Sequence, residues 1–535
     1  MDRRKFLQSI GLTGVATLAT GVETPPNAAG QSQLKSKAEA PSRSKTWLFW
    51  DMWHFDRRHN LELCQGRPTW RPEATFVENV DGLASWPTVY CDKDSGRWRM
   101  LYTARWSPYS LMVAESDDGL QFKPLSLPNL KPEGTKLAAH HVFTLPGGSC
   151  GGVYLDPIAE DGYPFKIFCH QRRKPVLQRA LTDPKHRWHS IAQREGDKPY
   201  LAEEMTLVSR DGLRWEIRLD MNWGLPDWHP EPPIFGFYNH HLEKHMMTVR
   251  PGWGDRRVCI QSSKDFRSWS GPELLLQPDP NDNELLELYG MPVFPYAGHY
   301  VGLLWIFHCE ASEATRGFNR FVGPLDCQLA YSYDGVRFSR GMRRPFITIN
   351  NPGEHGCGGI EPSCLVETEK EIRIYSSGSK VQHGKNFPAR KAGMKDFEAL
   401  LLHTLRKDGF MYLRSRGSWA SFITKPLVLF QGGLTMNAEA PYGEIHYQLT
   451  DVESKPIEGF AFEDCAPLKA GDSLDWRLAW RNNQLDQLVG KVIRLEVKLR
   501  AARLYAFRGD FHFVDAQDMW MLRDKKPIDT SLYDF

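Results

Sequence analysis

Short runs of β-branched and aromatic residues recur along most of the chain, and each is bounded by Gly, Pro, Asn or Asp. Such runs favour β-strands, because a pleated surface accommodates branched and ring-shaped side chains. They come in groups of three before a similar turn: residues 88–92, 97–104 and 111–116, for example, precede a turn at Asp118. The pattern therefore predicts an all-β protein.

The turns share the pattern Ser-x-Asp-Gly-x-x-aromatic, with Phe266 in the Gly position of the third copy. An Asp carboxylate binds nearby backbone amides and Gly readily adopts a positive φ, so the pattern is strong turn chemistry. Five similar groups of strands predict a five-bladed β-propeller over residues 46–425, and the alternative is a large sandwich with accidental turns. The copies are centred on Asp118, Asp211, Asp265, Asp334 and, in a degenerate form, Asp408.

Beyond residue 425 the repeat stops, and strand-like runs continue without it. Alternating apolar and polar positions between Gly, Pro and Asp turns predict a small β-sandwich over residues 426–514 and a polar tail over 515–535. Three long insertions interrupt the repeats, and they are either walls of a binding face or solvated excursions. They cover residues 171–201, 310–323 and 380–395.

Composition narrows the classes of function. The 535 residues include 67 Lys and Arg against 65 Asp and Glu, so the formal net charge is only +2. This balance argues against a nucleic-acid-binding protein, which usually has a basic excess. A hydrophobic content of 41% is that of a globular chain with a large core.

The first residues are typical of a targeting segment. Arg3 and Arg4 precede a weakly apolar run, which resembles a twin-arginine export signal over residues 1–29, followed by a flexible leader over 30–45. We therefore expect a periplasmic or secreted protein with no stable membrane anchor. Twin-arginine cargo folds in a reducing compartment, so we expect buried free thiols rather than disulfides. The cysteines in strand-like runs are Cys91, Cys169, Cys259, Cys327 and Cys364.

Several phrases give the chain a family resemblance. They are Trp86-Pro87-Thr88-Val89-Tyr90, Arg97 to Tyr102, Tyr289 to Phe294, Ile360-Glu361-Pro362-Ser363 and Ala501 to Phe507. Together with the order of signal, propeller and sandwich, they resemble the invertase and arabinanase superfamily of five-bladed glycoside hydrolases. The resemblance implies an enzyme that cleaves glycosidic bonds in an oligo- or polysaccharide. The family usually has an Asp at the start of the first inner strand, where this chain has Trp86-Pro87.

Glycoside cleavage needs two carboxyl groups, and inner strands of a propeller begin around one central channel. We expect Glu287, among apolar neighbours that raise its pKa, to be the general acid. Asp81 or Asp51 is the predicted nucleophile or base. Glu361 is a further catalytic candidate at a strand start. The predicted substrate-binding residues are Asp227, His229, Arg250, His141 and Trp86.

Two alternatives share the same scaffold. A glycoside phosphorylase needs a cationic phosphate pocket, for which Arg250, Arg256 and Arg257 are candidates. A non-catalytic carbohydrate-binding propeller is supported by the missing Asp at Trp86. No metal or other cofactor is expected, since the pairs His140-His141 and His240-His241 lack a fixed ligand spacing. The sugar, the linkage and the oligomeric state are left open by the sequence.

Overall fold

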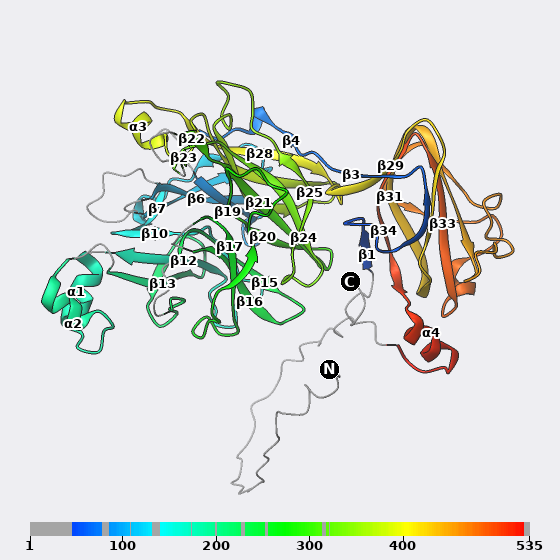
Figure 1. The fold of residues 1–535 in the computed structure, drawn as a ribbon, viewed down its shortest axis with the longest axis horizontal. Helices are drawn as coiled ribbons and strands as arrows, with labels where there is room; N and C mark the ends of the chain where they lie inside the picture. The colour runs from blue at the N-terminus through cyan, green and yellow to red at the C-terminus, as the bar shows by residue number, and fades with distance from the viewer. Residues whose placement is uncertain are drawn as a thin grey trace, which may run out of the picture. The chain divides into compact units, whose positions relative to one another are not determined.

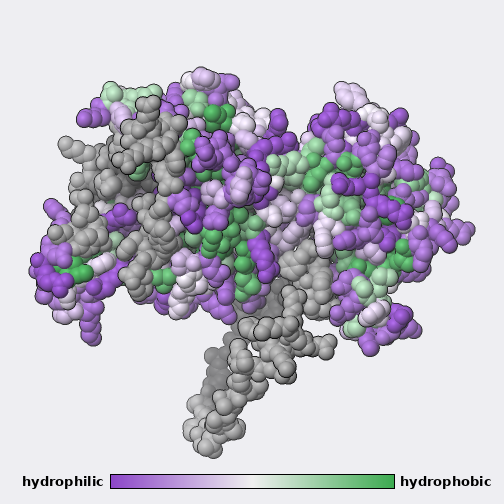
Figure 2. Space-filling view, viewed as in Figure 1, coloured by the Kyte–Doolittle hydropathy of each residue, from purple (hydrophilic) through white to green (hydrophobic). Residues whose placement is uncertain are grey.

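The computed structural model describes residues 45–77, 85–106, 109–130, 140–172, 174–197, 201–225, 230–251, 255–312, 317–319 and 321–528. The predicted export signal and most of the leader lie outside these residues, as do Asp81, Asp227 and His229. β-Strands dominate the described part of the chain, so the all-β prediction is confirmed (Figure 1). On the face drawn in Figure 2, hydrophilic residues predominate and hydrophobic ones form small groups.

The strands from residue 85 to residue 276 form three antiparallel sheets. In each sheet the strands follow one another in chain order, as expected for successive repeats. The first contains β5 (Ser85–Cys91), β6 (Trp98–Trp106), β7 (Tyr109–Ser116), β8 (Lys123–Pro124) and β9 (His141–Leu145). The second contains β10 (Gly148–Cys150), β11 (Tyr154–Leu155), β12 (Phe165–Arg172), β13 (Ala202–Ser209) and β14 (Trp215–Arg218). The third contains β15 (Glu231–Asn239), β16 (Lys244–Arg250), β17 (Val258–Ser263) and β18 (Glu273–Leu276).

Two further antiparallel sets are joined by one parallel bridge between Leu325 and Gly359, which makes them a single nine-stranded sheet. The fourth set contains β19 (Leu286–Gly290), β20 (Val293–Tyr296), β21 (His299–His308), β24 (Leu325–Ser332) and β25 (Ser339–Ile347). The fifth contains β26 (Gly359–Glu367), β27 (Glu371–Ser379), β28 (Glu398–Arg406) and, from the N-terminal side, β4 (Thr69–Trp70). The number of blades stays a prediction.

Four of the predicted turns have the same hydrogen bonds. At Asp334, the carboxylate accepts the backbone N–H of Val336 at 2.8 Å, the N–H of Arg337 at 2.7 Å and the hydroxyl of Ser332 at 2.9 Å. Gly335 has φ 71° and donates its N–H to the same hydroxyl. The turns at Asp118, Asp211 and Asp265 repeat these bonds.

The degenerate fifth turn is built differently. Asp408 itself adopts the positive φ, 61°, and its buried carboxylate binds the hydroxyl of Tyr296 and the amide of Asn437. Arg508 also contacts this carboxylate. This turn lacks the Ser of the other copies. Its Asp408 instead connects the fifth set of strands to Asn437 and Arg508 of the C-terminal sheet.

The predicted β-sandwich region forms a nine-stranded sheet around a separate apolar core (orange and red in Figure 1). Residues from the beginning of the chain join it, because β1 pairs with β34 and β3 with β29. Its strands are β1 (Lys45–Leu48), β2 (Phe55–His59), β3 (Glu62–Gln65), β29 (Met411–Ser415), β30 (Ala420–Thr424), β31 (Leu427–Thr450), β32 (Leu468–Arg477), β33 (Val492–Arg500) and β34 (Ala502–Phe513).

The described residues include four α-helices. The first insertion folds as α1 (Lys174–Thr182) and α2 (His189–Glu195), and the third contains α3 (Asn386–Lys391). The tail begins with α4 (Ala516–Arg523), whose capping box closes the N-terminal amides. No helix within the described residues has the length and apolarity needed to cross a membrane.

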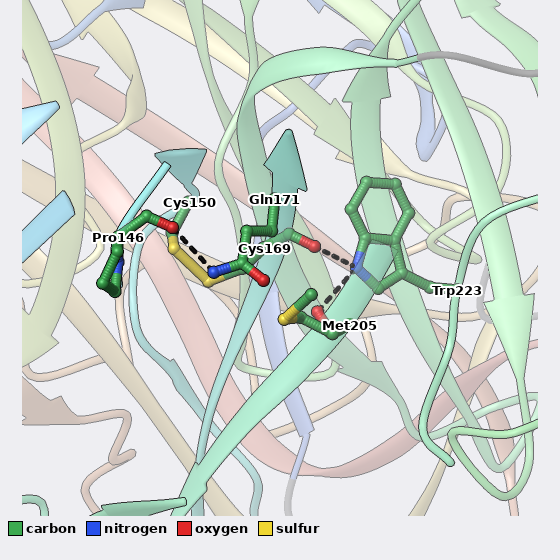
Figure 3. The surroundings of a disulfide bond; sticks show 6 residues. All are labelled: Pro146, Cys150, Cys169, Gln171, Met205 and Trp223. Atoms are coloured by element: carbon green, nitrogen blue, oxygen red, sulfur yellow. Dashed lines mark hydrogen bonds between the residues drawn. A yellow bond between two sulfur atoms is a disulfide. The ribbon is translucent and has the colours of Figure 1, made fainter. Parts of the chain in front are cut away.

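The cysteine prediction is wrong at two positions. Cys169 forms a disulfide with Cys150, because these residues face each other across β12 and β10 (Figure 3). Trp223 donates its indole N–H to the backbone oxygens of Cys169 and Met205 beside this bond. Cys91 is a free thiol but is exposed. The thiols of Cys259, Cys327 and Cys364 are free and buried, as predicted.

Candidate active site

A cavity of about 470 Å³ lies where the first strands of all five sets meet. Such a volume is typical of small-molecule sites. The first strands contribute Ser85 and Trp86 of β5, Ser149 of β10, Pro232 of β15, Tyr289 of β19, and Gly359 and Glu361 of β26. Leu325 of β24, residues 377–379 of β27, Glu398 of β28 and parts of two insertions complete the wall. The expected convergence of inner strands on one space is therefore observed.

The third insertion builds part of this wall. Val381, Gln382, His383, Gly384 and Asn386 line the cavity at the base of α3, and Phe321 lines it from the second insertion. Both insertions thus line a cavity, and their role as walls of a binding face stays a prediction. The first insertion, which contains α1 and α2, contributes no residue to the lining among the described residues.

Glu361 is the carboxyl group with the most altered environment in this cavity. Burial raises its pKa to about 7, and the indole hydrogen bond from Trp86 and the charge of Arg250 only partly oppose this rise. Trp86 Nε1 donates to Glu361 Oε2 at 2.8 Å. A carboxyl group with this pKa holds a proton near neutral pH and releases it easily, which suits a general acid.

Trp86 is held in a strained position. Its φ of 50° lies in the left-handed region, which is costly for a bulky residue. Its backbone N–H donates to Ser377 Oγ at 2.8 Å, and its ring packs against Phe235 and Trp305. Strain of this kind persists where surrounding contacts enforce it, and it clusters at functional sites. Here it aims the indole N–H at Glu361.

Tyr289 connects the cavity to buried cations. The Arg250 guanidinium lies 4.6 Å from the centroid of the Tyr289 ring, and the Tyr289 hydroxyl is 3.2 Å from His383 Nε2. Burial and the charges of Arg256 and Arg250 lower the pKa of His383 to about 3. His383 is therefore neutral at physiological pH and offers polar atoms without charge.

Glu287, the predicted general acid, is buried and paired with a cation. It is 2% exposed, and its Oε2 accepts from Arg256 Nη1 at 2.6 Å. It does not line the cavity, although Tyr289 on the same strand does. The apolar neighbours found in the sequence do bury Glu287, but the burial is matched by a cation supplied from the preceding segment. The guanidinium of the paired Arg256 lies 5.4 Å from the centroid of the Tyr289 ring.

Asp51 and His141 lie away from the cavity. Asp51 accepts from the Tyr333 hydroxyl at 3.1 Å, next to Ser332, which faces Tyr300 in the sheet. The cavity lies at the other end of β21, where Phe307 faces the lining residue Leu325. Tyr300 and Phe307 are seven residues apart, which is about 23 Å along the strand. His141 is buried in β9, where its Nε2 is 3.0 Å from the Thr144 hydroxyl, and it does not line the cavity.

Glu398 is a cavity residue that the sequence did not single out. It is 7% exposed, faces Ser379 across β28 and β27, and lies 3.4 Å from Arg390 of α3. Glu361 faces Ser377 on the other side of β27, so both glutamates project from the same face. Two strand spacings and two residues separate their Cα atoms, about 12 Å. Glu398 lies between the apolar residues Phe397 and Ala399. Apolar neighbours are also the reason for which the sequence favours Glu287.

No family model matches the chain, and no curated protein is similar to it in sequence. Among solved structures, it is similar to an N-acetylgalactosamine deacetylase from F. plautii in complex with blood group B trisaccharide (12% identity, TM-score 0.40, 65% of this chain and 96% of that one). A Bombyx mori GH32 β-fructofuranosidase matches with 10% identity and a TM-score of 0.39 over 83% and 93% of the two chains. A structure described as a glycoside hydrolase matches with 13% identity and a TM-score of 0.38, over 63% and 92%. Likenesses this distant assign no activity to the chain.

Proposed function

We propose that the protein is a glycoside hydrolase whose active site is the cavity at the first strands. The observation that carries this proposal is Glu361, a carboxyl group with a pKa of about 7 on the wall of a cavity of about 470 Å³. In the proposed reaction the protonated Glu361 donates its proton to the glycosidic oxygen, so that the bond to the anomeric carbon breaks without expelling an alkoxide.

Glu398 is the proposed second carboxylate. It would remove a proton from the attacking water or attack the anomeric carbon itself, and it shares a cavity wall with Glu361. Asp81, predicted from the sequence to fill this role, precedes the strand that carries Trp86. Trp86 supplies an apolar surface against which a sugar can pack, and Tyr289 and His383 supply polar atoms for its hydroxyl groups.

The test replaces Glu361 by Gln and measures hydrolysis of a panel of aryl glycosides and oligosaccharides. We expect kcat to fall by about 10²–10⁴-fold with a much smaller change in binding, because only proton donation is lost. Glu369→Gln, an exposed glutamate just beyond the end of the same strand, is the matched control and should retain full activity. Equal activity of the Glu361 variant and this control would refute the assignment.

Two further variants decide the second carboxylate. Glu398→Gln should lower kcat about as strongly as the Glu361 variant, whereas Asp81→Asn should do so only if Asp81 holds this role instead. Addition of inorganic phosphate tests the phosphorylase alternative: Arg256 is already paired with Glu287, and Arg257 with Asp255, so we expect turnover to be independent of phosphate. If the protein binds glycans and hydrolyses none of them, the alternative of a non-catalytic carbohydrate-binding propeller is supported instead.

We also propose export through the twin-arginine pathway to the periplasm or beyond. The support for the pathway is the Arg3-Arg4 pair in the sequence. The Cys150–Cys169 disulfide supports only an oxidising destination, because it is the opposite of what folding in a reducing compartment predicts. Fractionation of cells that produce the full chain, compared with an Arg3→Lys/Arg4→Lys variant, tests this. Retention of only the variant in the cytoplasm is the expected result.

A further inference from the structure

A second cavity, of about 510 Å³, lies where the chain passes between the fifth strand set and the sandwich sheet. Its walls come from β3, β4 and the connection between them, from β28, β29 and the connection between them, and from β25 and β34. The lining residues that matter below are Arg67, Arg344, Arg406, Arg414, Arg503, Tyr412 and Tyr505. The cavity is thus distinct from the candidate active site.

Its charge is strongly one-sided. Five of the lining residues are arginines, and none of the described residues that line it is Asp or Glu. Three of the arginines are paired with carboxylates outside the lining. These pairs are Arg414 with Glu62 at 2.6 Å, Arg406 with Asp472 at 2.7 Å and Arg503 with Glu439 at 2.6 Å.

Arg67 and Arg344 are the two lining arginines outside these three pairs. Both are exposed, and neither has an ion-pair partner among the residues that the structure describes. The cavity therefore carries an excess of about two positive charges near solvent. The net charge of the whole chain is only +2, so this excess is a local feature and not a consequence of a basic surface.

Two tyrosines line the cavity, Tyr412 half-buried and Tyr505 buried. The rings of Tyr412 and Tyr505 lie 5.4 Å apart, and each is covered by an arginine. Arg503 lies 5.6 Å from the Tyr412 ring and Arg406 lies 4.8 Å from the Tyr505 ring. Rings beside fixed cations form a mixed surface that suits a ligand with both a ring face and an anionic group.

The frame of the cavity is held by close backbone contacts. The N–H of Gly66 donates to the oxygen of Phe410 at 2.8 Å, and a Cβ at Gly66 would lie 1.8 Å from the oxygen of Gly409. Gln65 donates its side-chain amide to the oxygen of Pro345 at 3.3 Å. These contacts fix the two connecting segments, so little order would have to be created on binding.

We propose that this cavity binds an anionic saccharide, with the arginines holding its carboxylate or sulfate and the tyrosines contacting its ring. The guanidinium fork binds such planar or tetrahedral anions through paired hydrogen bonds. The site would hold a charged glycan away from the candidate active site. The proposal stands on the second cavity alone and does not depend on the hydrolase activity.

The test measures binding by calorimetry to the full chain carrying Glu361→Gln, the variant expected to slow any turnover of the probes. The probes are an oligogalacturonate, a sulfated galactan oligosaccharide, a neutral oligosaccharide and inorganic sulfate. Arg67→Gln/Arg344→Gln should weaken the acidic saccharides by about tenfold or more, since charge-assisted bonds are lost. Arg58→Gln, an exposed arginine on β2, should leave them unchanged.

Preference for the uronate or for the sulfated probe would identify which acid group is bound, and either preference supports the proposal. Added salt should weaken binding of the acidic saccharides. Neutral and acidic saccharides binding equally, inorganic sulfate binding as tightly as the sulfated saccharide, or a double variant that binds like the Arg58 control would each overturn it. A failed hydrolase assignment would leave these measurements unaffected.

Discussion

The pKa values of carboxyl groups shift in opposite directions in two regions of the strand sets, the repeated turns and the cavity. In the repeated turns, the carboxylates of Asp118, Asp211, Asp265 and Asp334 accept backbone N–H groups, and these bonds lower their pKa despite partial burial. In the cavity, the carboxyl group of Glu361 meets one indole N–H and a distant arginine, so burial dominates and raises its pKa to about 7.

The difference separates carboxylates that maintain the fold from one available for chemistry. The donors to a turn aspartate lie within three residues of it in the sequence. These local hydrogen bonds stabilise its charged carboxylate. Glu361 depends on partners from distant strands, and its proton is weakly held near neutral pH. Local hydrogen bonding therefore lowers the pKa of the turn carboxylates, and burial without such bonds raises the pKa of Glu361.

The largest expected effect in this comparison is on the pH dependence of stability. The folded-state pKa of Glu361 lies above the unfolded value of 4.5, so its protonated form stabilises the fold below about pH 4.5, and this stability is lost as pH rises through about 7. Glu361→Gln should remove that loss and be more stable than the wild type at about pH 8, by about 3 kcal/mol at most. Urea unfolding at several pH values measures it.

The control for this experiment is Glu369→Gln, which should follow the wild-type curve at every pH. If the Glu361 variant also runs parallel to the wild type, the carboxyl group is not buried in the way that the comparison requires.

A smaller effect, of opposite sign, is expected at the turns. Asp118→Ala leaves the N–H groups of Leu120 and Gln121 without their acceptor and should lower the free energy of unfolding by about 1–2 kcal/mol at neutral pH. Because the folded pKa of Asp118 is lowered, this difference should disappear as pH falls through that pKa. Asp117→Ala, the exposed neighbour paired with Arg97, is the matched control. An equal loss from both variants would show that the turn bonds contribute nothing of their own.

The same contrast explains what the sequence could predict. The turn motif carries its own hydrogen-bond partners within seven residues, so the four repeats and their strands could be predicted from local pattern. The β4 strand that completes the fifth set, and β1 and β3 in the sandwich sheet, could not, because their pairing partners are more than 300 residues away.

The candidate site was predictable only in part. Strand starts do converge on one cavity, and Glu361 and Trp86 both line it. Glu287 was favoured over Glu361 because apolar neighbours indicate burial but not which cation accompanies it. Arg256 lies 31 residues before Glu287, and only the fold brings the two together. Glu398 has the same apolar flanks, and its place on the wall follows from the register of β27 and β28.

The smallest expected effect tests the bond between Trp86 and Glu361. That bond stabilises the ionised carboxylate and lowers its pKa, so Trp86→Phe, which keeps the apolar ring and removes the donor, should raise the pKa of Glu361 further. The alkaline limb of the kcat/KM profile should then move to higher pH, while the activity on the acid side changes less. Trp98→Phe, which changes a tryptophan outside the cavity lining, should leave the limb in place. A limb that moves to lower pH in the Trp86 variant would mean that the indole holds the protonated acid instead, and that the raised pKa has another source.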